Sequence, residues 1–241
     1  TLHAPDWRFD PQELEAAFTD RTRALLLNTP HNPTGKVFSR GELEVLAALC
    51  RRYDALCITD EVYEHLVYEG RHVPMATLPG MRERTITISS FGKTFSLTGW
   101  KIGWAAAPPE LTAAVRAAHQ FVTFATATPL QHGAASALAA GPEYYAALLA
   151  DYSARRDYLS RELARLGFEL RPPQGTYFIC ADFRGFGFDD DRAFVRHMIE
   201  KAGVAAIPPS VFYDHPEEGR RYVRFAFCKK RETLEAAVAR L

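Results

Sequence analysis

Lys93 is the residue of this sequence whose surroundings best fit covalent chemistry. It lies in SSFGKTFSLTGWK, residues 89–101, between an expected strand and a turn, with hydroxyl groups and a second cation, Lys101, nearby. A lysine amine reacts with an aldehyde only after it loses its proton, and partly desolvated, apolar surroundings favour that loss. The segment therefore indicates a site that anchors an aldehyde rather than a basic surface patch.

Two polar residues follow another apolar strand. Asp60 comes directly after ALCIT, residues 55–59, and Tyr63 lies three residues later. Open α/β sheets bind ligands just beyond the carboxyl ends of their strands, which makes both residues candidates for a site. On this segment alone, a helix cap or a solvent-exposed carboxylate is the more usual role for Asp60.

Asn32 and Arg224 also allow a purely structural interpretation. Asn32 stands in NTPHNPTG, residues 28–35, where such residues are typical of turns for conformational reasons. The proline after Asn32 excludes a glycosylation signal. Arg224 lies in YVRFAF, residues 222–227, and an arginine in such a strand usually extends its charge to solvent or meets a carboxylate of the protein.

The segment around Lys93 resembles the pyridoxal-phosphate lysine motif of the fold type I aminotransferases of class I and II. The branch is the one that holds methionine, kynurenine and glutamine-phenylpyruvate aminotransferases. The likeness extends over nearly the whole chain, including GVAAIP, residues 203–208, and KKRETL, residues 229–234. It implies an α/β fold whose large domain has a mainly parallel sheet, a smaller α+β C-terminal domain, and pyridoxal 5'-phosphate as cofactor.

The resemblance gives the candidates around the cofactor ring their roles. Lys93 would hold the cofactor covalently and then, as a free amine, move a proton during catalysis. Asp60 would pair with the protonated ring nitrogen, the contact that makes the ring an electron sink. Asn32 and Tyr63 would hydrogen-bond the phenolic oxygen of the ring.

The resemblance also implies groups for the phosphate and the substrate. Ser90 and Lys101 would bind the cofactor phosphate. Many relatives have arginine where Lys101 stands; lysine keeps the positive charge but lacks the bidentate fork of arginine. Arg224 would hold the α-carboxylate of the amino acid, and closure of the small domain would exclude water. Phe124, in HQFVTF, would reach a substrate site across a dimer interface, with core packing as the alternative.

The expected reaction is transfer of an amino group between an amino acid (methionine, aromatic or glutamine-like) and a 2-oxo acid. The nearest alternative is a carbon–sulfur β-lyase that uses the same cofactor, and a noncatalytic aminotransferase remnant stays open. A P-loop nucleotidase fits poorly, because Thr87 stands where the phosphate loop before Gly92-Lys93-Thr94 needs a glycine. The sequence does not decide which amino acid is preferred.

Relatives in this branch carry a long segment before the position of Thr1, which supplies part of the large domain and part of the phosphate site. We therefore expect either a fragment of a longer enzyme or a remnant. We expect the chain alone to be poorly soluble or self-associated and to bind the cofactor weakly, because the edge strand at residues 23–28 would leave backbone groups and an apolar face uncovered.

Composition places the chain among ordinary globular proteins. Its 241 residues are 47% hydrophobic, with 29 basic and 29 acidic side chains and a formal net charge of zero. Neither a nucleic acid nor an anionic membrane is an expected partner, and the histidines show no metal-ligand spacing. The four cysteines stand singly, which predicts buried reduced thiols, and we expect a cytoplasmic homodimer.

The elements that must position the site alternate between strands and helices in the first part of the chain. Strands are predicted at residues 23–28, 55–59 and 84–89, and helices at residues 10–18 and after Ser39, which forms a capping box with Glu42. Leu43, Leu46, Ala47 and Cys50 share one face of the second helix. This alternation predicts parallel strands with right-handed crossovers.

The pattern of expected helices and strands changes beyond Pro129. An alanine-rich helix to residue 140, a Gly-Pro break and a long helix over residues 143–166 lead into strands at residues 168–171, 177–182 and 221–228. Helices are predicted near residues 190–201 and from Arg231 onward. We therefore divide the chain into a large domain, residues 1–140, and a small domain, residues 141–241.

Overall fold

The structure is a computed structural model that describes all residues from 1 to 241. The chain forms two compact units. The first unit comprises Thr1–Pro30 and Val37–Ala146, and the second comprises His31–Lys36 and Ala147–Leu241. The division therefore falls a few residues after the predicted one, within a long helix, and a short loop from the N-terminal half belongs to the second unit.

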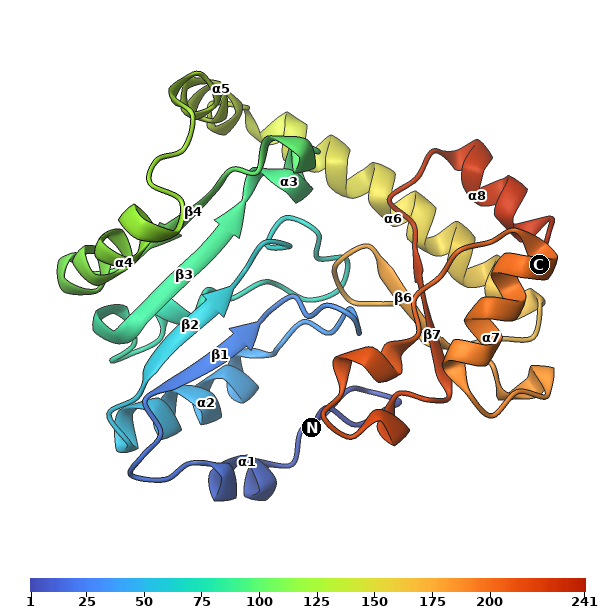
Figure 1. Cartoon of the computed structure of the whole chain (residues 1–241), viewed down its shortest axis with the longest axis horizontal. Coiled ribbons are helices and arrows are strands. Elements are labelled where there is room, and N and C mark those ends of the chain that lie inside the picture. Colours follow the sequence, from blue (N-terminus) through green and yellow to red (C-terminus); the bar gives the residue numbers. More distant parts are fainter. The chain divides into compact units, whose positions relative to one another are not determined.

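The first unit is built on a four-stranded sheet with the order β1-β2-β3-β4 (Figure 1). The strands β1 (Ala24–Asn28), β2 (Leu56–Asp60) and β3 (Thr85–Ser90) run parallel, as predicted. The fourth strand, β4 (Gly103–Ala106), pairs antiparallel with β3 and was not predicted. In the strand register, Asn28 is opposite Asp60, and Asp60 is opposite Ile88. The polar residues at the carboxyl ends of β1 and β2 therefore lie at the same end of the sheet.

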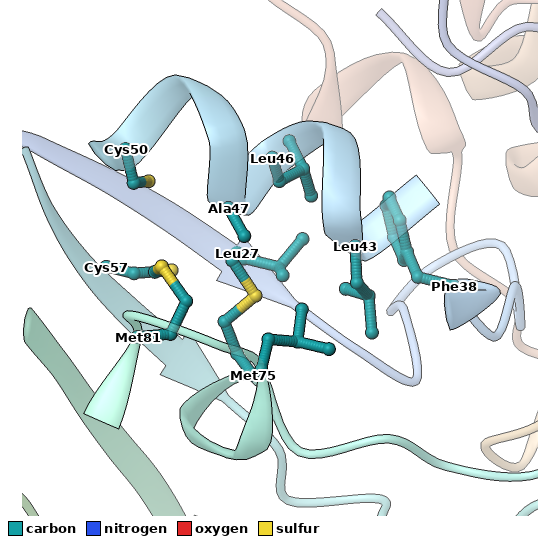
Figure 2. Close-up of a cluster of buried hydrophobic side chains, with 10 residues drawn as sticks. Leu27, Phe38, Leu43, Leu46, Ala47, Cys50, Cys57, Met75 and Met81 are labelled. Atoms are coloured by element: carbon teal, nitrogen blue, oxygen red, sulfur yellow. The ribbon is translucent and has the colours of Figure 1, made fainter. Parts of the chain in front are cut away.

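Helix α2 (Arg40–Arg52) packs on this sheet, as its apolar face predicts. It begins with the predicted capping box, in which Ser39 and Glu42 bond each other's backbone amides. Leu43, Leu46, Ala47 and Cys50 are buried against side chains from β1 and β2 and from the segment before β3 (Figure 2). Each fully buried leucine contributes roughly 1.5–3 kcal/mol to stability, so this face holds α2 on the sheet.

The remaining helices of the first unit lie at its surface or connect its strands. They are α1 (Pro11–Ala17), α3 (Phe91–Thr94), α4 (Pro109–Val122) and α5 (Thr128–Leu138), with 3-10 turns η1 (Met75–Thr77), η2 (Arg82–Arg84) and η3 (Thr98–Trp100). Helix α4, which the sequence patterns did not predict, has no buried residue. None of the helices of the chain combines the length and the apolar character needed to cross a membrane.

The second unit has a three-stranded antiparallel sheet with the order β5-β6-β7. The strands are β5 (Glu169–Leu170), β6 (Phe178–Asp182) and β7 (Tyr222–Ala226), all within the predicted ranges. The helices are α6 (Pro142–Arg165), which begins in the first unit, α7 (Asp191–His197), a π-helical turn (Met198–Ala202) and α8 (Arg231–Val238), with 3-10 turns η4 (Arg184–Phe186), η6 (Pro209–Phe212) and η7 (Pro216–Glu218).

Aromatic side chains form much of the core of the second unit. Phe183 and Phe194 stack with ring centroids 4.3 Å apart, and Phe168 meets Phe225 edge to face at 5.4 Å. Such pairs add about 0.5–1.5 kcal/mol to the stabilisation from burial alone. The small sheet is thereby held as a rigid base for Arg224 on β7.

Candidate active site

Lys93 lies on the short helix α3, directly after β3. Ser90 ends the strand and caps the helix, since its hydroxyl oxygen accepts a hydrogen bond from the Gly92 amide at 3.3 Å. The Thr98 hydroxyl donates to the Gly92 carbonyl oxygen at 2.8 Å and closes the following turn. Phe91 is buried beside Phe95, so apolar packing fixes the helix that carries the lysine.

Asp60 and Tyr63 meet Lys93 at the carboxyl ends of β2 and β3. The Lys93 Nζ atom lies 5.9 Å from the centre of the Tyr63 ring, and Tyr63 is buried. Burial raises the pKa of Asp60 above its ordinary value, while the Val62 amide, which donates to Asp60 Oδ1 at 3.2 Å, and the charge of Lys93 lower it. The carboxylate is thus partly desolvated and close to the lysine charge.

The backbone around Asp60 is also held in place. The Asn28 side-chain amide donates to the Asp60 carbonyl oxygen at 2.9 Å, and the Thr29 amide donates to the same oxygen at 3.0 Å. These bonds continue the β1–β2 ladder past the strand ends. They fix the point at which the Asp60 carboxylate leaves the sheet.

Lys101 stands close to Ser90 through the pairing of β3 with β4. Ser90 is level with Gly103, and the Phe91 amide donates to the Ile102 carbonyl oxygen at 3.2 Å. Lys101 is exposed and adopts a left-handed backbone conformation, with φ of 56°, at the end of η3. A hydroxyl and a cation therefore lie at the same end of β3 as Lys93.

The predicted residues of the second unit are joined to each other. Arg224 Nη1 donates to Asn32 Oδ1 at 2.7 Å, although the two residues are 192 positions apart in the sequence. The Arg224 guanidinium carbon lies 4.1 Å from the centre of the Phe178 ring and 5.0 Å from that of Phe212. The arginine therefore has a fixed orientation within an aromatic environment.

The loop that carries Asn32 is tied to the second unit by its own contacts. The Gly175 amide donates to the Gly35 carbonyl oxygen at 2.8 Å, and the Cys180 thiol donates to the Pro33 carbonyl oxygen at 3.3 Å. A side chain at Gly35 would not fit, because an added Cβ would lie 2.3 Å from Pro173 Cβ. Within the loop, His31 Nδ1 lies 2.8 Å from Thr34 Oγ1.

Comparison with known proteins decides the family. The profile of the family "Aminotransferase class I and II" matches residues 1–241. The chain belongs to this family.

Two curated aminotransferases show the level of similarity. The probable N-succinyldiaminopimelate aminotransferase DapC of Mycobacterium tuberculosis is 48% identical, over 98% of this chain and 63% of its own length. Human kynurenine–oxoglutarate transaminase 1 is 44% identical, over 96% of this chain and 60% of its own length. The chain thus spans about three fifths of the length of the curated relatives it matches.

Solved aminotransferase structures share the fold. The N-succinyldiaminopimelate aminotransferase of M. tuberculosis superposes with a TM-score of 0.95, over 98% of this chain and 63% of that one, at 48% identity. YbdL of Escherichia coli, described with a methionine aminotransferase function, gives a TM-score of 0.94 at 40% identity, over 99% of this chain and 63% of that one. The fold predicted from the sequence is confirmed: both units belong to the pyridoxal-phosphate-dependent aminotransferase fold.

The donor groups of the first unit fit the pyridoxal phosphate that class I and II aminotransferases use. An amine, a partly buried carboxylate and a buried phenol gather at the ends of β2 and β3, from Lys93, Asp60 and Tyr63. Ser90 and Lys101 add a hydroxyl and a cation of the kind that binds phosphate. The set therefore suits an aldehyde that carries a ring nitrogen and a phosphate.

Phe124 stands apart from these residues. It follows the end of α4 with its side chain 81% exposed, beside Phe121 at 87%. Core packing, the alternative considered from the sequence, is therefore wrong for this chain. Large exposed aromatic side chains that lie near one another are typical of a contact surface.

Sequence reasoning missed several neighbours of the candidate site residues. Phe178 and Phe212 flank Arg224, and Ser89 and Glu64 bond each other beside Tyr63. A phenylalanine in an apolar strand carries no signal of its own, because its role depends on the register of β6 with β7. Only the serine pair before Lys93 could have drawn attention, since successive strand residues point to opposite faces of a sheet.

Proposed function

We propose that the protein is a pyridoxal-phosphate-dependent aminotransferase that moves an amino group between an amino acid and a 2-oxo acid. The observation that carries this proposal is the meeting of Lys93, Tyr63 and Asp60 at the carboxyl ends of β2 and β3. The sequence similarity to named transaminases supports the same reaction class. The proposed cofactor domain is residues 1–140 and the proposed small domain residues 141–241.

Each residue around the cofactor has a defined task in this proposal. The cofactor supplies an electron sink for the bonding electrons at the substrate Cα. Lys93 would hold the cofactor aldehyde and, as a free amine, would move a proton at the substrate Cα. Ser90 and Lys101 bind the phosphate, and Tyr63 donates a hydrogen bond to the phenolic oxygen.

Asp60 keeps the ring nitrogen protonated. Its burial disfavours the ionised carboxylate, so a cation opposite it stabilises the charged form. A protonated ring nitrogen supplies that cation and is itself stabilised. Each unit by which the carboxylate raises the pKa of the ring nitrogen corresponds to about 1.36 kcal/mol in favour of the protonated ring.

Arg224 and Asn32 form the substrate carboxylate site in this proposal. The planar guanidinium, oriented by Asn32 Oδ1 and Phe178, can give two parallel N–H bonds to an α-carboxylate. Asn32 would also hydrogen-bond the phenolic oxygen of the cofactor. Methionine, aromatic amino acids and glutamine are the proposed amino donors, in keeping with the relatives named for kynurenine and methionine.

We further propose a homodimer in the cytoplasm. The exposed Phe124 and Phe121 at the end of α4 supply an apolar contact surface for a second copy, and Phe124 would reach the partner's substrate site. The free thiols of the four cysteines suit a reducing compartment. No nucleic acid, metal ion or membrane has a part in the proposal.

The test is amino transfer from a panel of donors by a chain that contains these 241 residues. Methionine, phenylalanine, kynurenine and glutamine are each incubated with a 2-oxo acid and pyridoxal phosphate, and the newly formed amino acid is measured. We expect transfer that Lys93→Ala abolishes. Release of ammonia and a thiol from a cysteine conjugate without amino transfer would favour the β-lyase, and no reaction in either assay would favour a noncatalytic protein.

A further inference from the structure

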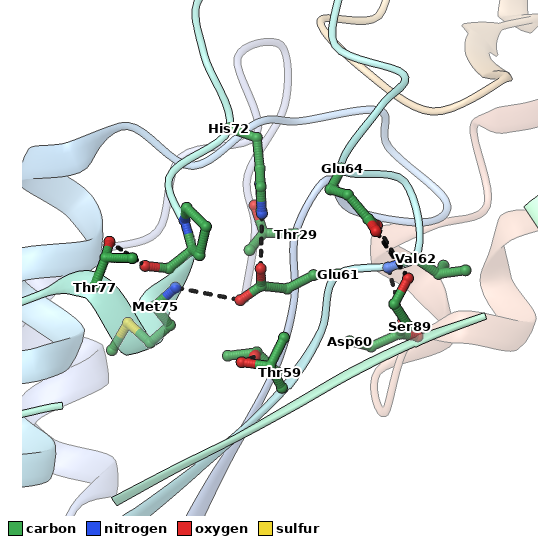
Figure 3. A network of polar contacts seen from close by, with 12 residues as sticks. Thr29, Thr59, Asp60, Glu61, Val62, Glu64, His72, Met75, Thr77 and Ser89 are labelled. Carbon is green, nitrogen blue, oxygen red and sulfur yellow. Dashed lines mark hydrogen bonds and ion pairs between the residues drawn. The ribbon is translucent and has the colours of Figure 1, made fainter. Parts of the chain in front are cut away.

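The turn after β2 is attached to β3 on both sides of Tyr63. Before Tyr63, the Glu61 amide donates to the Ile88 carbonyl oxygen at 2.8 Å. After Tyr63, the hydroxyl oxygen of Ser89 lies 3.0 and 3.1 Å from the two carboxylate oxygens of Glu64, a contact drawn in Figure 3. Tyr63 therefore sits in a segment with one backbone and one side-chain attachment to the same strand.

The side-chain attachment lies in a partly desolvated place. Ser89 is 3% exposed, and the Glu64 side chain is 21% exposed. Burial raises the pKa of Glu64, whereas its backbone amide hydrogen bond, the Ser89 hydroxyl and the nearby His72 lower it, and the neighbouring Glu61 raises it further. A hydrogen bond to a charged carboxylate is stronger than one between neutral groups, so this bond is a firm attachment.

Glu61 holds the turn from its other face. Its carboxylate lies 2.8 Å from His72 Nε2 and accepts from the Met75 amide at 3.2 Å. Figure 3 shows the Glu61 side chain directed toward the segment with His72 and Met75, and Glu64 directed toward Ser89. The contact with β3 side chains therefore depends on Glu64 rather than on Glu61.

The bond connects two parts of the proposed site. Ser89 is followed by Ser90 and by α3, which carries Lys93, while Glu64 directly follows Tyr63. We infer that Ser89 and Glu64 are positioning residues, whose hydrogen bond sets the Tyr63 side chain relative to the Lys93 amine. This inference rests on the proposed function for its catalytic meaning, but the geometry it predicts exists without the cofactor.

The first test measures the Lys93 amine in protein without cofactor. An amine-reactive acylating reagent is applied in limited amount, and peptide mapping gives the labelling rate of Lys93 relative to exposed Lys101 in the same molecule. We expect Ser89→Ala to change this ratio by about 3- to 10-fold. Ser89→Thr, which keeps the hydroxyl, and Glu64→Gln, which keeps an acceptor oxygen, should stay within about twofold of the unsubstituted protein.

Ser39→Ala is the matched control. The Ser39 hydroxyl donates to Glu42 Oε2 at 2.9 Å, so the variant also removes a serine–glutamate hydrogen bond from the first unit, at the start of α2. A general loss of stability would change the labelling ratio in both serine variants. We expect only Ser89→Ala to change it.

The second test uses the protein loaded with pyridoxal phosphate. Ser89→Ala should lower kcat about 10-fold, leave the KM for the amino donor within about threefold, and shift the midpoint of the pH-dependent visible absorbance. Glu64→Ala should do the same, and the double variant should add little, because both changes remove one interaction.

The outcomes separate this inference from the proposed function. An unchanged labelling ratio in both Ser89→Ala and Glu64→Ala would overturn the inference, whatever the activity. A changed ratio in a protein that transfers no amino groups would retain the positioning role and refute the proposed function. If Ser89→Ala does not fold, the other two variants test the inference. It then requires that Glu64→Ala changes the labelling ratio and that Ser89→Thr does not.

Discussion

Acidification should destabilise the second unit through His31, the residue next to Asn32. Burial, and then the positive charge of Lys36, lowers the pKa of His31 from its ordinary value of 6.5 to about 4. The folded state therefore favours the neutral ring. The unfolded chain, in which the ring regains its ordinary pKa, binds a proton more readily over the whole interval between these values.

The sign and size of the effect follow from this difference. The stabilisation is fully present above about pH 6.5 and is lost progressively as the pH falls through 6.5 toward 4, since the unfolded state takes up the proton first. At pH 5 the lost free energy of unfolding is about 2 kcal/mol, taken from 1.36 kcal/mol per pKa unit. A protonated ring beside Lys36 would also loosen the loop that holds Asn32.

The assay is urea unfolding of the chain at pH 7 and pH 5, followed by the fluorescence of the second unit's tyrosines or by amide exchange of β6 and β7. His31→Gln removes the titrating ring and keeps a polar side chain next to Thr34. The control is His215→Gln, because the His215 side chain lies in the same unit and is 70% exposed.

We expect the loss of stability between pH 7 and pH 5 to be about 2 kcal/mol smaller in His31→Gln than in the unsubstituted chain. His215→Gln should leave that loss unchanged. Equal losses in the unsubstituted chain and His31→Gln would refute the reasoning, because they would show that His31 titrates alike in the folded and unfolded states.

Three further predictions concern the site and the sheet edge. Asp60→Ala should lower the rate of amino transfer about 10- to 100-fold, the effect of lowering the pKa of the ring nitrogen by one or two units. Cofactor retention, measured by dialysis, should change less. An unchanged rate would show that Asp60 only caps the turn. Arg224→Lys should raise the KM for the amino donor about 10-fold or more, because a point charge replaces a fork held by Asn32 and Phe178, and an unchanged KM would remove Arg224 from the substrate site. Leu26, 75% exposed on the edge strand β1, should promote association of the 241-residue chain, so Leu26→Lys should lower its sedimentation coefficient; a chain that is monodisperse without the substitution would contradict this.

The sequence predicted those parts of the fold that depend on neighbours along the chain. The capping box of Ser39 and Glu42 and the buried face of α2 are local patterns, and both are present. The parallel strands β1, β2 and β3 were predicted because short apolar runs alternate with a helical pattern. Strand β4 was missed because its four residues are all exposed, so that no apolar alternation marks it.

Long-range pairings were beyond local reasoning. The loop at His31–Lys36 belongs to the second unit, although the residues on both sides of it belong to the first. The bond between Arg224 and Asn32, and that between Ser89 and Glu64, arise from the register of strands and turns that are distant in the sequence. The family resemblance named Asn32 and Arg224, whereas it gave no role to Glu64 or to Ser89, the first residue of the lysine segment.

The most direct test of the proposed function is to locate the lysine that binds the cofactor. A chain that contains these 241 residues is incubated with pyridoxal phosphate, reduced with borohydride so that the cofactor stays on the amine, and mapped by peptide mass spectrometry. We predict the label on Lys93, at the end of β3 beside Tyr63. Label on Lys101 or Lys36, or no label at all, would contradict the account.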